Sequence, residues 1–355
     1  SLFAALLHLS SPSDVAKRRK TKFPLFEKIE EDSIVKRENP NAMKNRQVIC
    51  KEFGPPENLI IEQREIPSPK EEEVLVKLLA AGVGYVDSLM VQGLYQVKPP
   101  LPYYPGSEFA GEVIQIGEHV DNIKPGDLVM GMWRGAYADH MTVPSSECTV
   151  IPGSLSVDVA GGFYTNYSTA LFGLRDCGNL KPGENVLILG ASGGVGSSAI
   201  AVAKAMGANV IAGASSREKL ELASSVGADE TILYSKEDWR TELKALLGNE
   251  SLTMVYDPVG GDLAEPAFRS LAPGGRFLVV GFASGTIPSI PLNLALLKQS
   301  SIVGVDWGGA MRSDPSLTPT LQKTLLDWIE SGRLTPAKVS TRPLSEIREA
   351  LSDQI

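Results

Sequence analysis

The sequence has few of the residues that build metal centres and disulfide frameworks. It contains three cysteines and three histidines in 355 residues. The cysteines are too widely spaced for a disulfide framework or a zinc ribbon, and no histidine lies in a ligand-spaced motif. We therefore expect a reducing compartment and chemistry without a resident metal. These residues are Cys50, Cys148, Cys177, His8, His119 and His140.

The sequence also lacks long apolar runs and a basic surplus. The longest uncharged stretch, 185–203, is too rich in Gly and Ser for a membrane span. A net charge of −8 argues against binding to a phosphate backbone. A length of 355 residues with 43% hydrophobic residues suits two compact α/β domains. We expect a small-molecule substrate and neither a nucleic acid nor a membrane partner.

One glycine-rich stretch organises the second half of the chain. Residues 186–189 form a short apolar run after a turn, which predicts a buried strand. The cluster 190–196 follows at once, and 197–206 is small and apolar enough for a packed helix. Glycines between a strand and a helix let the backbone approach a pyrophosphate closely. The N–H groups at the start of the helix then bind its negative charge. The alternative to a cofactor site is a plain βα turn. The predicted cofactor-binding residues here are Ser192, Gly193, Gly194, Val195 and Gly196.

The next predicted strand, 210–214, indicates which dinucleotide binds. About 20 residues after the glycines, an NAD enzyme places a carboxylate on the ribose 2′-hydroxyl. Ser215 and Ser216 stand there instead, and Arg217 and Lys219 follow them. Uncharged hydroxyls with two cations suit a 2′-phosphate, so the sequence predicts NADPH. The alternative is that both cations are ordinary solvated residues in the first turn of a helix.

The two ends of the chain differ from its middle. From Met43 onward strand signals dominate, and after the glycine stretch strands and helices alternate, which predicts βαβ units and a parallel sheet. Residues 1–42 are expected to lie outside the fold as a leader or extension. Their apolar start is followed by the basic run 17–20, the reverse of a secretory signal.

From Met43 onward the chain resembles a zinc-free medium-chain dehydrogenase/reductase of the quinone oxidoreductase branch. The motifs that match, taken together in their order along the chain, are specific for the superfamily and much less specific for a substrate. They lie at 53–56, 81–87, 92–95, 105–111, 125–127, 190–196, 256–261, 273–282 and 307–308.

The resemblance implies an α/β protein with a GroES-like β-barrel catalytic domain and a Rossmann domain, the doubly wound parallel sheet that binds NADPH. It also implies a homodimer or homotetramer. Residues 43–165 would form the catalytic domain, 166–306 the NADPH-binding domain, and 307–355 would return to the catalytic domain. The family continues with a closing strand, so we expect a truncated C-terminus. A cytoplasmic location is expected, or a mitochondrial one if residues 1–42 act as a leader.

The resemblance also bears on zinc. Where zinc alcohol dehydrogenases carry a ligand cysteine and a ligand histidine, this chain has Gly84 and Ser107. Neither is a zinc ligand, and a catalytic zinc needs three protein ligands. Gly84 also replaces a family asparagine near the nicotinamide ribose, a contact that Tyr85 or Asp87 would only partly restore. Asp87 has the alternative role of capping the helix after it.

The resemblance supplies the catalytic candidates. Tyr95 aligns with the tyrosine that donates a hydrogen bond in similar enoyl thioester reductases; the alternative is that it packs its loop. Thr169 matches a threonine that faces the nicotinamide, or is a helix-interior hydroxyl. Tyr234 ends a strand where the family places an aromatic ring against the adenine. The residues after a later strand reach the edge of the sheet where cofactors bind. These are Gly281, Phe282 and Ala283.

The sequence thus predicts an NADPH-dependent, zinc-independent reductase that transfers hydride to a quinone or a related α,β-unsaturated carbonyl. Negative charge then develops on the acceptor oxygen and needs a donor within about 3 Å. One alternative is an enoyl thioester or 2-alkenal reductase. From another class, a crystallin-like structural protein would bind NADPH without turnover.

Overall fold

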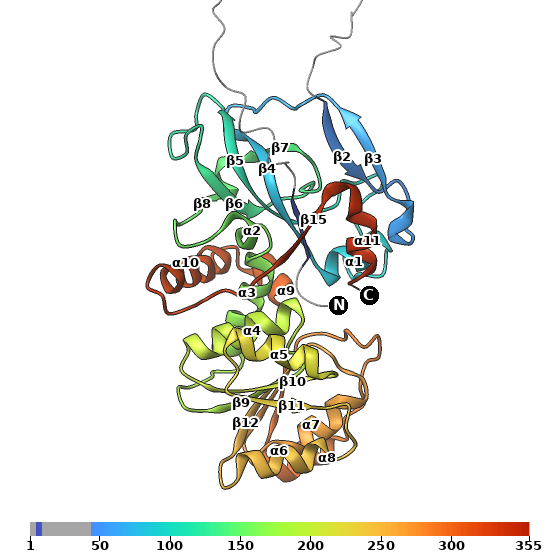
Figure 1. Cartoon of the computed structure of the whole chain (residues 1–355), viewed down its shortest axis with the longest axis vertical. Helices are drawn as coiled ribbons and strands as arrows, with labels where there is room; N and C mark the ends of the chain where they lie inside the picture. Colours follow the sequence, from blue (N-terminus) through green and yellow to red (C-terminus); the bar gives the residue numbers. More distant parts are fainter. Residues whose placement is uncertain (1–4, 9–43, 355) are drawn as a thin grey trace, which may run out of the picture.

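Two sheets of different character divide the chain (Figure 1). The computed structural model describes residues 5–8 and 44–354. The first sheet has the order β15-β1-β4-β5-β6-β8, with β7 also paired to β4, and most of its pairs are antiparallel. The second has the order β11-β10-β9-β12-β13-β14, and every neighbouring pair in it is parallel. A barrel domain and a Rossmann-type domain follow from these two patterns.

The strands of the barrel domain are β1 (Ala5–His8), β4 (Glu73–Val83), β5 (Glu108–Ile116), β6 (Leu128–Met132), β7 (His140–Pro144), β8 (Cys148–Val150), β15 (Ser340–Pro343) and the separate ribbon β2 (Asn45–Ile49) and β3 (Ile60–Arg64). The parallel sheet consists of β9 (Asn185–Ile188), β10 (Asn209–Ala214), β11 (Glu230–Leu233), β12 (Leu252–Asp257), β13 (Arg276–Val279) and β14 (Ser301–Gly304).

The helices are α1 (Tyr85–Val91), α2 (Val157–Ala160), α3 (Tyr164–Leu171), α4 (Gly194–Ala205), α5 (Arg217–Val226), α6 (Trp239–Leu247), α7 (Ala264–Ser270), α8 (Leu292–Lys298), α9 (Trp307–Ser313), α10 (Leu317–Glu330) and α11 (Ile347–Ser352). A π-helical segment, Phe172–Cys177, continues α3. Single 3-10 turns lie at Pro56–Asn58, Ser145–Glu147, Gly261–Leu263 and Leu344–Glu346.

Strand β9 shows why the parallel sheet is covered on both faces. Its side chains alternate between two buried clusters: Val186 and Ile188 lie in the cluster that includes α3, α4 and α10. Leu187 lies in the opposite cluster with α6 and α7. A parallel strand buried on both faces requires apolar residues at every position, and the short run predicted from the sequence meets that requirement.

Part of the amino-terminal segment belongs to the barrel sheet, which differs from the prediction for residues 1–42. On one edge of β4, β7 pairs only as far as Lys77, while Ala80 to Val83 remain available on that edge. Strand β1 pairs there antiparallel to β4, and its other edge pairs with β15. An apolar segment that satisfies open backbone groups in this way becomes part of the sheet. The rest of residues 1–42 lies outside the described residues.

The carboxyl-terminal part of the chain serves both domains. Helix α10 places Leu321, Leu325 and Ile329 in the buried cluster of α3 and α4. Strand β15 and helix α11 return to the barrel, where Arg348 donates two hydrogen bonds to the carbonyl of Leu59. The domain bounds 43–165, 166–306 and 307–355 remain predictions.

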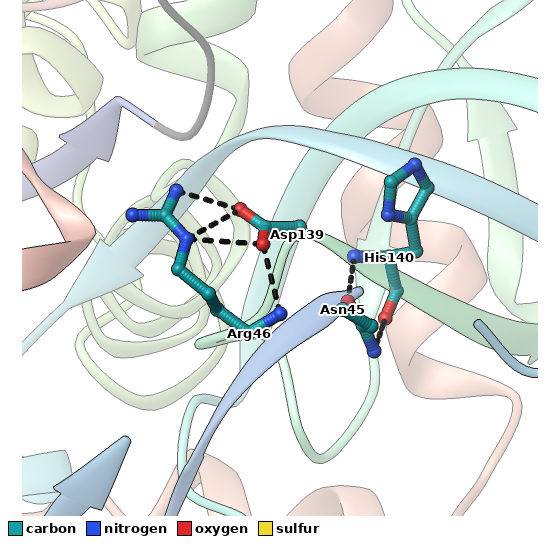
Figure 2. A network of polar contacts seen from close by, with 4 residues as sticks. All are labelled: Asn45, Arg46, Asp139 and His140. Carbon is teal, nitrogen blue, oxygen red and sulfur yellow. Dashed lines mark hydrogen bonds and ion pairs between the residues drawn. The ribbon is translucent and has the colours of Figure 1, made fainter. Parts of the chain in front are cut away.

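A polar network joins β2 to the start of β7 and the residue before it (Figure 2). The Arg46 guanidinium meets the Asp139 carboxylate through Nη2–Oδ1 at 2.8 Å and Nε–Oδ2 at 3.0 Å. The Arg46 backbone N–H also donates to Oδ2 at 2.9 Å. Beside this pair, Asn45 Nδ2 donates to the His140 carbonyl at 3.0 Å, and the His140 N–H donates to Asn45 Oδ1 at 2.8 Å. The ribbon is therefore held by side chains in addition to its backbone bridges.

Candidate active site

The predicted glycine turn connects β9 to α4. Gly190 has a φ of 58°, and Gly193 is the extended residue before the helix. A Cβ on Gly196 would lie 2.2 Å from the Gly190 carbonyl oxygen, so no other residue fits there without moving the backbone. The helix therefore starts close to the sheet, at Gly194, three residues before the predicted start. The first N–H groups of an α-helix have no partner within the helix, so here they can bind an anion, as the predicted pyrophosphate site requires.

The residues after β10 form a small hydroxyl and cation cluster. Ser216 is the N-cap of α5, and its Oγ accepts the Lys219 N–H at 3.3 Å. Lys219 Nζ donates to Ser215 Oγ at 3.1 Å. No carboxylate lies among residues 213–217. Arg217 opens α5 beside this cluster, so the site presents hydroxyls and positive charge.

The ends of β12 and β13 complete this edge of the sheet. Asp257 Oδ1 accepts the N–H groups of Val259 and Gly260 at 2.8 and 2.9 Å. Its backbone carbonyl accepts from Gly281, and the Ala283 N–H donates to the carbonyl of Pro258. The ring of Phe282 packs against Gly260, where a Cβ would lie 2.9 Å from Cδ1. Asp257 was not among the predicted site residues, although it lies in the motif 256–261; its carboxylate holds the turn after β12.

Tyr234 lies next to the same edge. Its N–H donates to the Ala214 carbonyl at 3.1 Å. A Cβ on Gly213 would come within 3.2 Å of Tyr234 Cδ1, so the ring lies against the end of β10. The predicted cofactor residues thus gather along one edge, and their glycine cradle and cation cluster fit a dinucleotide.

The catalytic candidates lie on different elements. Tyr95 follows α1 in a loop and is half-buried. Burial raises the pKa of the Tyr95 hydroxyl. The negative charge of Asp306 at the start of α9 also raises it, and the positive charge of Arg312 opposes this effect. Thr169 lies in α3 and is also half-buried. No hydrogen bond links Tyr95 to Thr169 in the part of the chain that the structure describes, so their catalytic roles remain predictions.

The start of α1 carries a second polar group. Asp87 lies at the third helical position, and its Oδ2 accepts the N–H of Gly84 at 3.0 Å. The alternative predicted for Asp87, the N-cap of the following helix, is wrong in position: Gly84 is the N-cap, and Asp87 caps the helix from inside its first turn. Its other oxygen, Oδ1, accepts from Ser107 Oγ at 2.9 Å. Gly106 fixes the position of Ser107, because a Cβ there would lie 2.7 Å from the Tyr137 nitrogen. This pair was not predicted from the sequence, in which Ser107 stands out only as a position without a zinc ligand.

Within residues 44–354, no three His, Cys, Asp or Glu side chains are grouped so that they could hold a metal ion. Over the same residues, no helix combines the length and apolar character needed to cross a membrane.

Comparison with known proteins places the chain in a family. Residues 70–170 match the alcohol dehydrogenase GroES-like domain, and residues 194–330 match the zinc-binding dehydrogenase domain. The quinone oxidoreductase-like protein 2 homolog of Nematostella vectensis is 35% identical over 310 residues, which cover 86% of this chain and 84% of the relative. The chain belongs to the quinone oxidoreductase branch of the medium-chain dehydrogenases/reductases. The predicted family and the predicted fold class are confirmed.

Other relatives agree with this assignment. Human quinone oxidoreductase is 31% identical over 303 residues, covering 84% of this chain and 90% of the relative. The structure of Escherichia coli quinone oxidoreductase complexed with NADPH matches with a TM-score of 0.75 at 28% identity, covering 86% of this chain and 95% of the other. The CurK enoyl reductase structure matches with a TM-score of 0.77 at 25% identity, over 87% and 95% of the two chains. The protein is therefore a nicotinamide-dependent oxidoreductase.

Proposed function

We propose that the protein is an NADPH-dependent, zinc-independent reductase that transfers hydride to a quinone or a related α,β-unsaturated carbonyl. The observation that carries the cofactor choice is the cluster of Ser215, Ser216 and Lys219 after β10, with Arg217 beside it. A carboxylate there would repel a 2′-phosphate, whereas hydroxyls and cations bind it. The NADPH complex of the related Escherichia coli enzyme supports the same choice.

The reduced nicotinamide supplies hydride when bound, and the chain supplies position and polarity. The glycine turn and the first N–H groups of α4 bind the pyrophosphate. Tyr95 stabilises charge on the acceptor oxygen as a hydrogen-bond donor. Its pKa is raised by burial, which keeps the phenol protonated and able to donate.

The second candidate is an enoyl thioester or 2-alkenal reductase. The similarity to the CurK enoyl reductase favours keeping it. Both acceptors place a carbonyl next to a carbon–carbon double bond, so the same donor serves either. The two functions differ in the length of the acceptor. Comparing the rates of reduction of a 1,4-quinone, a short enone and an enoyl thioester distinguishes them.

The test is a fluorescence titration of NADPH and NADH, followed by oxidation assays with each acceptor. For Arg217→Ala/Lys219→Ala we expect NADPH affinity to fall by about tenfold or more while NADH affinity changes little. The matched control is Arg240→Ala/Lys244→Ala on α6, which removes the same charge elsewhere in the domain. Equal use of NADH by the wild-type protein would contradict the phosphate argument. Tight NADPH binding without turnover of any acceptor would support the crystallin-like role instead.

We also propose that the protein is a homodimer. Strand β14 is the outer strand of the parallel sheet, and Ile302 on it is 41% exposed. Three leucines of α8 and one isoleucine in the segment before that helix are 75–77% exposed, and we call these four residues and Ile302 the α8 patch. An open strand edge beside an apolar patch suits pairing with a second copy through a two-fold axis. The four residues are Ile287, Leu292, Leu296 and Leu297.

A further inference from the structure

A single segment of the chain connects the predicted cofactor edge to the α8 patch. Residues 281–283, which follow β13, are predicted to bind the cofactor, and the same segment carries the exposed Ile287 of the patch. It then continues to Pro291, the N-cap of α8, and the exposed leucines of that helix also belong to the patch. We call residues 282–291 the linking segment.

The first half of the linking segment is held by the turn after β12. The Ala283 N–H donates to the carbonyl of Pro258 at 3.0 Å, and the Gly261 N–H donates to the carbonyl of Thr286 at 3.0 Å. A Cβ on Gly260 would lie 3.1 Å from the Thr286 carbonyl oxygen, so the two backbones are in close contact. The position of Thr286 is therefore tied to that of the turn.

The second half of the linking segment has little support. Residues 287–290 form no hydrogen bond with any other residue that the structure describes. Residues 286–289 line one side of a cleft of about 570 Å³, whose opposite wall includes residues of α6 and α7. The Ile287 side chain is 75% exposed. Because few contacts hold this half, ordering it has a cost in conformational entropy.

A second copy that covers the α8 patch would contact this half of the segment directly. Ile287 is itself part of the patch, so the partner buries its side chain where the chain has no support of its own. The restriction reaches the neighbouring Thr286 and, through its hydrogen bond to Gly261, the turn after β12. The partner therefore orders the backbone next to the predicted cofactor residues 281–283.

We propose that NADPH binding and dimerisation stabilise each other through the linking segment. This inference rests on the proposed function, because it needs both the NADPH site and the homodimer. A cofactor on residues 281–283 and a partner on Ile287 favour the same ordered backbone, so whichever binds second meets a smaller entropic cost. The coupling is reciprocal: the factor by which the dimer binds NADPH more tightly than the monomer is also the factor by which each bound NADPH tightens the dimer.

The wild-type protein provides the first test. Light scattering over a dilution series measures the dissociation constant of the dimer without cofactor and with saturating NADPH. We expect the NADPH affinity of each subunit to be about tenfold higher in the dimer than in the monomer. Because a dimer has one site in each subunit, saturating NADPH should lower its dissociation constant by about a hundredfold. A dissociation constant that NADPH does not change would overturn the inference.

The second test uses Leu296→Glu/Leu297→Glu, which changes α8 and leaves the linking segment intact. Fluorescence titration should give this variant an NADPH affinity about tenfold below that of the wild-type dimer and equal to that of wild-type protein diluted to monomers. That equality separates loss of the partner from a direct effect of the substitutions, and thermal unfolding checks that the variant is folded. Leu246→Glu is the matched control and should keep wild-type affinity.

Hydrogen exchange reports on the segment itself. Amide exchange of residues 286–290 should slow when NADPH binds to the wild-type dimer, and without cofactor it should be faster in Leu296→Glu/Leu297→Glu than in the wild-type dimer. Exchange at these residues that responds neither to NADPH nor to the loss of the partner would contradict the role of the linking segment.

The outcomes distinguish this inference from the proposed reductase activity. A monomeric variant with wild-type NADPH affinity would overturn the inference and leave the reductase standing, because no acceptor enters these measurements. A wild-type dimer that shows the coupling and reduces no acceptor would support the inference and remove the reductase. A wild-type protein that stays monomeric at every concentration, with or without NADPH, would overturn the inference together with the homodimer.

Discussion

The carboxylate of Glu108, at the start of β5, accepts a hydrogen bond from the backbone N–H of Thr165, at the start of α3. The two residues are 57 positions apart, and the bond ties the barrel to the helix that carries Thr169. Glu108 is 6% exposed, and burial raises its pKa to about 7. This carboxyl therefore holds its proton more strongly in the folded protein than in the unfolded chain.

The first prediction concerns stability and pH. Between about 4.5, the ordinary pKa of a glutamate, and about 7, the folded protein binds more protons at Glu108 than the unfolded chain, so stability falls as pH rises. Denaturant unfolding at several pH values should show that Glu108→Gln removes about 1 to 3 kcal/mol of this fall. Glu112→Gln on the same strand is the control. An unchanged pH dependence in E108Q would contradict the assignment.

The second prediction separates two glycines of the cofactor turn. Gly196→Ala places a Cβ 2.2 Å from the Gly190 oxygen, so the turn must open and NADPH affinity should fall at least about tenfold. A Cβ on Gly193 would lie 3.4 Å from the same oxygen, an ordinary contact in the absence of ligand. Gly193→Ala should therefore fold with wild-type stability, and it is the matched variant for Gly196→Ala because it adds the same methyl group to the same turn. Calorimetric titration and thermal unfolding measure both effects, and equal affinity of G196A and wild type would refute the steric argument.

The third prediction tests the α8 patch. Leu296→Glu/Leu297→Glu places charge on two side chains that are 77% and 76% exposed. If a second copy covers them, the variant should run as a monomer in light scattering while the wild type runs as a dimer. Leu246→Glu on α6, 36% exposed, should leave the dimer intact. A monomeric wild type would reject the homodimer.

Much of the Rossmann-type domain could be predicted because its signals are local. The apolar run 186–189 and the glycines after it lie next to one another in the sequence, and the observed β9 and α4 differ by a few residues at their ends. The helix starts earlier than predicted because its first turn includes Gly194 and Gly196, and the close approach to Gly190 requires a glycine at position 196. Propensity alone argues against glycine in a helix, and packing outweighs it.

The polar pairs at the domain junction could not be predicted from local patterns. Ser107 and Asp87 are 20 positions apart, and each has an ordinary interpretation by itself. Their pairing depends on the path of β4, α1 and β5, which no spacing rule contains. The pairing of the strand Ala5–His8 could not be predicted for the same reason. The apolar character of this segment is visible in the sequence, but its position depends on the part of β4 that β7 leaves unpaired in the folded sheet.

The return of α11 to the barrel has a consequence for protein synthesis. The Leu59 carbonyl and the Ser88 hydroxyl find partners in Arg348 and Leu351, which are 289 and 263 positions later. The ribosome must add the whole parallel sheet between them, which takes on the order of ten seconds or more at cellular elongation rates. During that time the first part of the barrel has to persist without α11. The barrel therefore gains this helix only after the parallel sheet has been translated, however quickly that sheet folds.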